Sequence, residues 1–124
     1  MNRPSRKELY GKLHSARKAI REGWVALLNQ LSLAADAIDM GFSIEFELNA
    51  VLIELLDETA PTHYVGSKPP QRSYEQDIQG LELFAFIVES NRFKCRVYFK
   101  FALEEEIFWL VSLHPDRPKK EEEL

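Results

Sequence analysis

The sequence contains one cysteine, Cys95, among 124 residues. One thiol cannot form a disulfide framework or a cysteine-based zinc site within the chain. Because Cys95 alternates in phase with apolar neighbours, we expect a buried structural thiol. No run of about 18 apolar residues occurs, and the N-terminus is charged, which argues against a transmembrane helix or a secretory signal. We therefore expect a soluble cytoplasmic protein without a membrane partner.

Motifs for metal or nucleotide binding are also missing. The three histidines, His14, His63 and His114, lack ligand spacing such as H-x-x-x-H. The stretch "YVGSKPP" has a glycine and a lysine, but it lacks the spacing of a P-loop and the helix that follows one. No serine sits in a recognisable nucleophile elbow. We expect neither a metal nor a cofactor.

Length and charge narrow the possibilities further. A chain of 124 residues with 45% hydrophobic content predicts a single domain over residues 1–124. The net charge of -4 is unevenly distributed: residues 1–22 carry seven cations and two anions, whereas residues 23–61 carry seven anions and no cation. Local basic surfaces can therefore meet a polyanion despite the overall negative sign.

The first half of the chain predicts three helices. Ser5 and Glu8 have the spacing of a capping box, and apolar residues recur at helical spacing over about 5–22. The cations of this segment are typical of a solvated basic face. A second helix is predicted over about 25–40, ending at Gly41.

The stretch "FSIEFELNAVLIELLDE" begins with the alternation of a strand but keeps a helical pattern for about four turns. Ser43 can cap this third helix, and Glu45 and Glu47 suit the positive end of its dipole.

The second half predicts a long loop and then a sheet. Residues 59–80 contain three prolines and two glycines without a sustained period. Three strands follow at about 81–89, 93–103 and 106–113, and their short connections predict an antiparallel meander with 93–103 in the middle. The expected class is α+β, with N-terminal helices packed on a C-terminal antiparallel sheet. Residues 1–4 and 115–124 are expected to be frayed tails.

The stretch "FKCRVYFKF" divides its residues between the two faces of the predicted sheet. Phe93, Cys95, Val97, Phe99 and Phe101 share one parity, and Lys94, Arg96, Tyr98 and Lys100 share the other. On the next strand, Ser112 and His114 have the parity opposite to Trp109, Val111 and Leu113. His114 can therefore lie beside Tyr98 on the open face, and Lys68 and Arg72 from the loop can close over it.

The open face combines a phenol, an imidazole and several cations. Such a set can bind a phosphodiester, stabilise developing negative charge and transfer protons without a metal. In RNA the neighbouring 2′-hydroxyl supplies the nucleophile. A half-exposed sheet whose outer face is polar only because it meets water is an equally simple interpretation.

The order of elements resembles the RelE-like toxins of bacterial toxin–antitoxin modules, and among them the MqsR family of messenger-RNA interferases. The resemblance runs from about residue 12 to residue 114 and is carried by "ADAIDMGF", "NAVLIELL", "THY", "RVYFKF" and "LVSLH". It implies a RelE-like fold, metal-independent cleavage of single-stranded messenger RNA, and inhibition by a cognate antitoxin protein. Tyr98 matches the family's active-site tyrosine, and His114 stands where the family has a lysine. The catalytic lysine of the family's loop has no aligned counterpart, although Lys68 can substitute for it in space.

Three functional classes follow. In the first, an endoribonuclease uses His114 as general acid or base, Tyr98 as a positioning or proton-transfer group, and cations around the phosphates: Lys94, Arg96, Lys100, Lys68, Arg72 and Arg117. In the second, the same fold is a noncatalytic module that binds protein or RNA. In the third, an open aromatic face formed by Phe84, Phe86 and Phe108 supports a homodimer. The acidic middle segment favours a protein partner with a basic segment.

Overall fold

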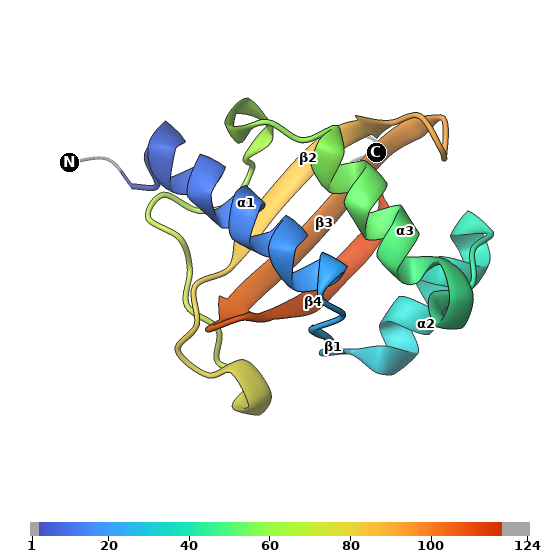
Figure 1. The fold of residues 1–124 in the computed structure, drawn as a ribbon, viewed down its shortest axis with the longest axis horizontal. Coiled ribbons are helices and arrows are strands. Elements are labelled where there is room, and N and C mark those ends of the chain that lie inside the picture. The colour runs from blue at the N-terminus through green and yellow to red at the C-terminus, as the bar shows by residue number, and fades with distance from the viewer. Residues whose placement is uncertain (1–2, 118–124) are drawn as a thin grey trace, which may run out of the picture.

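Three helices precede most of the sheet along the chain, and α1 and α3 cover one face of it (Figure 1). The computed structural model describes residues 3–117. The helices are α1 (Arg6–Arg21), α2 (Gln30–Met40) and α3 (Ile44–Asp57). The strands are β1 (Val25–Leu27), β2 (Phe84–Ser90), β3 (Cys95–Glu104) and β4 (Ile107–Pro115). The predicted α+β class, with helices packed against the sheet, is confirmed. None of the helices in this part of the chain is long and apolar enough to cross a membrane.

The helix ends follow the local chemistry of the sequence. Ser5 Oγ accepts the Glu8 N–H at 3.0 Å at the start of α1. Ser43 Oγ accepts the Phe46 N–H at 3.2 Å at the start of α3. Gly41 adopts φ 83° directly after α2, in the left-handed region that glycine enters without steric cost. The predicted starts of α1 and α3 and the predicted end of α2 are confirmed.

The predicted second helix is wrong at its N-terminal end, because Val25–Leu27 forms the short strand β1. This strand pairs parallel to β4, with Ala26 opposite Trp109. The Leu28 N–H also donates to the Leu110 carbonyl at 3.0 Å. Alanine and leucine suit a helix, so the extended backbone here depends on pairing with a strand about 80 residues away rather than on local preference.

The sheet has the strand order β1-β4-β3-β2. The meander of β2, β3 and β4 with β3 in the middle is confirmed, although β1 makes the whole sheet mixed rather than antiparallel. Strand β3 begins at Cys95, so Phe93 and Lys94 belong to the preceding turn. Lys94 has φ 59° and donates its N–H to the Ser90 carbonyl at 2.9 Å. The prediction that Lys94 lies on the open face of the strand is therefore wrong.

A bulge in β4 changes which side chains face the helices. Lys100 pairs with Ser112, whereas Phe101 pairs with Leu110, so Val111 is an extra residue between them. The bulge shifts the alternation by one residue. Trp109 and Val111 therefore lie on the face away from the helices. Simple alternation along the strand had placed both of them with the core.

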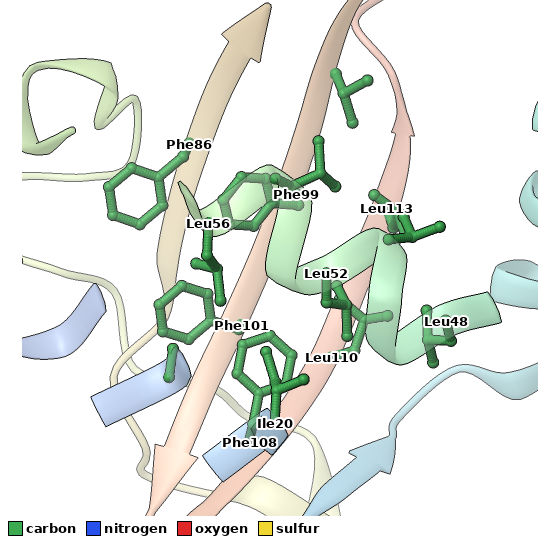
Figure 2. Packing of buried hydrophobic residues seen from close by; sticks show 14 of the residues in the cluster. Ile20, Leu48, Leu52, Leu56, Phe86, Phe99, Phe101, Phe108, Leu110 and Leu113 are labelled. Carbon is green, nitrogen blue, oxygen red and sulfur yellow. The ribbon is translucent and has the colours of Figure 1, made fainter. Parts of the chain in front are cut away.

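The main core lies between the helices and the sheet and contains a row of phenylalanine rings (Figure 2). The Phe101 ring stacks on Phe108 at 5.0 Å and on Phe86 at 6.0 Å between centroids. Phe84, Phe86 and Phe108 are at most 1% exposed. The proposed open aromatic face for dimerisation is therefore wrong. Cys95 is partly exposed rather than buried, because it is the first residue of β3.

The loop before β2 covers one end of the opposite face of the sheet. It contains two 3-10 turns, Pro61–His63 and Gln76–Ile78. The side chains of Ile78, Ala102 and Val111 form a second, small apolar cluster there, and partly buried Leu28, Leu81, Leu83 and Trp109 pack against it. The other end of this face, toward the end of β4, carries the polar residues predicted for the site.

The predicted tails are ordered where they are described. Arg3 forms ion pairs with Glu8 and Glu82, which joins the N-terminus to the segment before β2. Pro115 ends β4, and the Asp116 N–H donates to the Arg96 carbonyl at 2.8 Å. The prediction of fraying is therefore wrong at these positions, and residues 1–2 and 118–124 lie outside the described part of the chain.

Candidate active site

Tyr98 and His114 are direct cross-strand partners on β3 and β4. Their rings stack with centroids 5.0 Å apart and an interplanar angle of 17°. Both side chains are half-buried and lie on the face of the sheet away from the helices. The structure therefore brings together the two residues that the sequence placed at the centre of the site.

The orientation of the His114 ring is fixed by its own strand end. His114 Nδ1 lies 2.8 Å from the Pro115 carbonyl oxygen. A carbonyl oxygen only accepts hydrogen bonds, so Nδ1 carries a hydrogen in this arrangement. In the neutral ring Nε2 then has the free lone pair and can accept a proton from a substrate.

The Tyr98 hydroxyl carries its proton at neutral pH and so has one to donate. Burial raises the pKa of this phenol above its usual value, because a phenolate is poorly solvated there. At neutral pH Tyr98 therefore stays protonated. The stacked pair thus combines a candidate proton acceptor on His114 with a candidate proton donor on Tyr98.

Two of the predicted cations share this face. Lys100 pairs with Ser112 on β4. This pair lies two residues along the strands from the Tyr98–His114 pair and therefore shares its face. Arg96 lies at the other side of Tyr98, where its guanidinium is 3.6 Å from the Asp116 carboxylate. The exposed Glu89 on β2 is its cross-strand partner. Lys100 therefore supplies positive charge to the face more directly than Arg96 does.

The predicted loop cations lie elsewhere. Lys68 lines a hollow with Arg6 and Leu9 of α1, toward the helix layer. Arg72 donates to the Gly80 carbonyl at 2.8 Å and lies near Lys12 of α1. The prediction that Lys68 and Arg72 close over the open face is wrong, because the loop backbone runs along the edge of β2, where Tyr64 bridges to Phe86.

Arg117 is also engaged away from the stacked pair. Its guanidinium binds the Asp36 carboxylate of α2 at 3.0 Å. Lys94 lies in the turn before β3, as described above. Of the eight predicted site residues, the structure therefore gathers Tyr98, His114, Arg96 and Lys100 on one face.

Sequence reasoning missed the groups that set the properties of this face. The Pro115 carbonyl determines which His114 nitrogen is free, Asp116 pairs with Arg96, and Glu89 is the cross-strand neighbour of Arg96. Glu89 carried a readable signal, since its parity within β2 places it with Ile87 on the open face. The pairing with Asp116 carried none, because it depends on β4 extending to Pro115.

The described residues include no group of three or more histidine, cysteine or carboxylate side chains placed to hold a metal ion. The groups present on the face can bind an anion and move protons through side chains alone. The sequence matches none of the protein-family models and none of the curated proteins with which it was compared.

Proposed function

We propose that this chain is a metal-independent endoribonuclease, a messenger-RNA interferase toxin with an MqsR-like, RelE-like domain. The observation that carries the proposal is the stacked Tyr98–His114 pair, with its free Nε2, beside Lys100. The RNA strand lies single-stranded on this open face, and the setting is the cytoplasm. A cognate antitoxin, which the family resemblance implies, holds the toxin inactive.

Cleavage begins at the 2′-hydroxyl next to the scissile phosphate. His114 Nε2 takes the proton of this hydroxyl, and the 2′ oxygen forms a bond to phosphorus. The bond from phosphorus to the 5′ oxygen breaks, and the departing oxygen takes a proton from Tyr98. The products are a 2′,3′-cyclic phosphate and a 5′-hydroxyl. The proton on His114 then returns to Tyr98 through solvent.

Positive charge stabilises the transition state, in which negative charge accumulates on the phosphate oxygens. Lys100 lies two residues from Tyr98 along β3, on the same face, and no pairing with a carboxylate of the described residues is found for it, whereas Arg96 pairs with Asp116. Electrostatic stabilisation of this kind is usually a large contribution to catalysis. Arg96 adds to this stabilisation once a phosphate of the RNA displaces the Asp116 carboxylate from its guanidinium.

A noncatalytic module that binds protein or RNA is the second candidate. It is favoured by the pairing of Arg96 with Asp116 and by the placement of Lys68 and Arg72 away from the face. Fewer cations on the face mean weaker stabilisation of a transition state, while contact with a partner needs no such charge. The two candidates differ in whether a covalent bond of the RNA is broken.

The test is incubation of the purified chain with labelled single-stranded RNA in excess chelator. We expect fragments that end in 2′,3′-cyclic phosphate, and we expect His114→Ala to abolish them. His14→Ala is the matched control, because His14 is an exposed histidine of α1 on the helix layer. A strand with 2′-O-methyl groups should remain intact, since it lacks the nucleophile.

Cleavage that survives in His114→Ala would refute the assigned role of His114. Binding of RNA without cleavage by the folded wild type would instead support the noncatalytic module. The far-ultraviolet circular dichroism of each variant shows whether it remains folded.

A further inference from the structure

The loop before β2 runs beside the N-terminal end of α1 (Figure 1), and a hollow of about 210 Å³ lies between them. Arg6 of α1 and Lys68 of the loop both line this hollow. The remaining lining residues are two hydroxyl-bearing and three apolar ones: Thr62, Tyr64, Pro4, Leu9 and Pro61. The hollow therefore combines two cations, hydroxyl groups and apolar walls, and no carboxylate lines it.

The two cations of the hollow are available to a ligand. Glu8 and Glu82 lie nearby, but both carboxylates already pair with Arg3. No ion pair within residues 3–117 involves Arg6 or Lys68, and both side chains are exposed. Two neighbouring cations without carboxylate partners attract an anion, and a phosphate can accept hydrogen bonds from both of them at once.

The outer side of α1 next to the hollow adds an aromatic ring and a third cation. Tyr10 is 64% exposed. It follows Arg6 by four residues and Lys7 by three, so its ring lies beside both on the helix surface. Glu8 is the only carboxylate of α1, and at 100° per residue it lies about 160° around the helix from Arg6 and from Tyr10. Cations interleaved with an exposed aromatic ring are typical of surfaces that bind single-stranded nucleic acid.

We propose that the Arg6–Lys68 surface, defined by Arg6, Lys7, Tyr10, Thr62 and Lys68, binds the backbone of single-stranded RNA. A phosphate lies in the hollow, where Arg6, Lys68 and the Thr62 hydroxyl donate hydrogen bonds to it. The base of a neighbouring nucleotide stacks on the Tyr10 ring, and Lys7 meets the next phosphate. An acidic peptide fits less well, because its carboxylates make no use of the exposed ring.

The position of this surface at the β2 edge connects it with the Tyr98–His114 face on the other side of the sheet. Tyr64, which lines the hollow, bridges to Phe86, and Phe86 pairs with Phe99, the residue after Tyr98. The backbones of Tyr64 and Phe99 are therefore about 10 Å apart, which is two strand spacings. One RNA strand that turns around this edge can occupy both places. The choice of RNA rests on the proposed function, and a strand that cannot be cleaved tests the surface separately from catalysis.

The experiment measures binding of a labelled 2′-O-methyl RNA of about 10 nucleotides to the full chain, by fluorescence anisotropy at several salt concentrations. We expect Arg6→Gln with Lys68→Gln to weaken binding at least about tenfold at low salt. The slope of log association constant against log salt should fall by about 1.4, since each lost phosphate contact removes about 0.7. We expect Tyr10→Leu to weaken binding about fivefold or more without a change in slope, because stacking involves no counterion.

Lys18→Gln is the matched control on the same helix. The side chain of Lys18 is exposed like that of Arg6, but it lines a hollow together with three carboxylate residues, Glu22, Glu105 and Glu106. These carboxylates offset its charge, so Lys18→Gln should change RNA binding less than about twofold. Far-ultraviolet circular dichroism shows that each variant remains folded.

Several results would overturn the proposal. An unchanged salt slope in the Arg6→Gln, Lys68→Gln variant would refute the phosphate contact, and unchanged affinity in Tyr10→Leu would refute the stacked base. Equal weakening by Lys18→Gln would show that the RNA responds only to the total charge of the helix. An acidic peptide of equal charge that displaces the strand as well as unlabelled RNA does would assign the surface to an acidic protein. Absence of binding to the folded wild type would refute the surface outright, whereas the expected variant effects without cleavage of ordinary RNA would support it and refute the proposed catalysis.

Discussion

Replacing Gly66 with alanine should loosen the loop before β2, because a β-carbon at this position has no room. It would lie 2.6 Å from the Tyr64 hydroxyl oxygen, 2.8 Å from Cζ and 2.9 Å from Cε1. The Tyr64 ring cannot easily give way. It packs edge-on against Phe86 with centroids 5.7 Å apart, and its hydroxyl donates to the Ser67 carbonyl.

The contacts at stake set the expected size of the effect. Displacing the ring loses an aromatic pair worth about 0.5–1.5 kcal/mol. It also loses a hydrogen bond worth about 0.5–1.5 kcal/mol. Gly66 does not have a positive φ, so alanine fits the backbone and stabilises by about 0.4–1 kcal/mol through the unfolded state. The net loss in the free energy of unfolding should be roughly 0.5–2 kcal/mol.

A double-mutant cycle tests this reasoning by urea unfolding, followed through tryptophan fluorescence. In a Tyr64→Ala background the obstructing ring is gone, so Gly66→Ala should become neutral or slightly stabilising. The sign of the Gly66→Ala effect should therefore reverse between the two backgrounds. Equal destabilisation in both would show that the ring contact is not the cause.

Four further predictions concern the core, a helix end, a surface ion pair and the site. Phe101→Ala removes a ring that is 0% exposed and should cost about 3–5 kcal/mol of unfolding free energy; a loss below about 1 kcal/mol in urea titration would contradict the packing described. Gly41→Ala forces a β-carbon into φ 83° and should lower stability by about 1 kcal/mol, so an unchanged thermal midpoint would be inconsistent with that backbone. Arg92 hydrogen-bonds Glu54 at 2.7 and 2.9 Å and holds the pKa of that carboxyl below its usual value. Because the folded pKa is lower than the unfolded one, the pair's roughly 0.2–1 kcal/mol is present above the unfolded pKa and lost as pH falls through the folded pKa. Arg92→Met should therefore flatten the decline of stability below about pH 5, and an identical decline would exclude the pair as its source. Tyr98→Phe should slow single-turnover RNA cleavage by roughly 100-fold while the stacked His114 stays in place, and wild-type speed would exclude proton donation by the phenol.

Local chemistry in the sequence was enough to predict most of the helical half. Ser5, Ser43 and Gly41 act within their own turns, so caps and stops were readable from neighbouring residues. Val25–Leu27 was misassigned because a three-residue parallel strand has no pattern of its own. Its extended form depends on β4, which lies far along the chain.

Alternation was enough to place Tyr98 and His114 together, but register and irregularity set its limits. The bulge at Val111 reverses parity in the first half of β4 and sends Trp109 to the second face. The predicted position of His114 beside Tyr98 is correct because His114 comes after the bulge. It pairs with Tyr98 just as Ser112 pairs with Lys100. A bulge needs only one extra residue in one strand, so it leaves little trace in the sequence pattern.

The prediction for the loop cations Lys68 and Arg72 was wrong for a different reason. Lys68 and Arg72 lie in a segment without periodicity, where no local rule gives the direction of the chain. Their positions follow from backbone contacts of the loop with β2, at Tyr64 and Val65, and with Glu82 and Leu83 just before β2. Such contacts are properties of the folded molecule.

Strand β1 is one outer strand of the sheet, and the Tyr64–Val65 segment lies along the other outer strand, β2. On one side β1 pairs with β4 from Phe108 to Leu110. On the other, Tyr64 bridges to Phe86 and the Val65 N–H donates to the Ala85 carbonyl at 2.9 Å. Exposed strand edges are the usual templates for aggregation and for partners that add a strand. Part of the β2 edge is thus occupied from within, and the other edge is a strand of only three residues, so growth of the sheet between molecules is disfavoured.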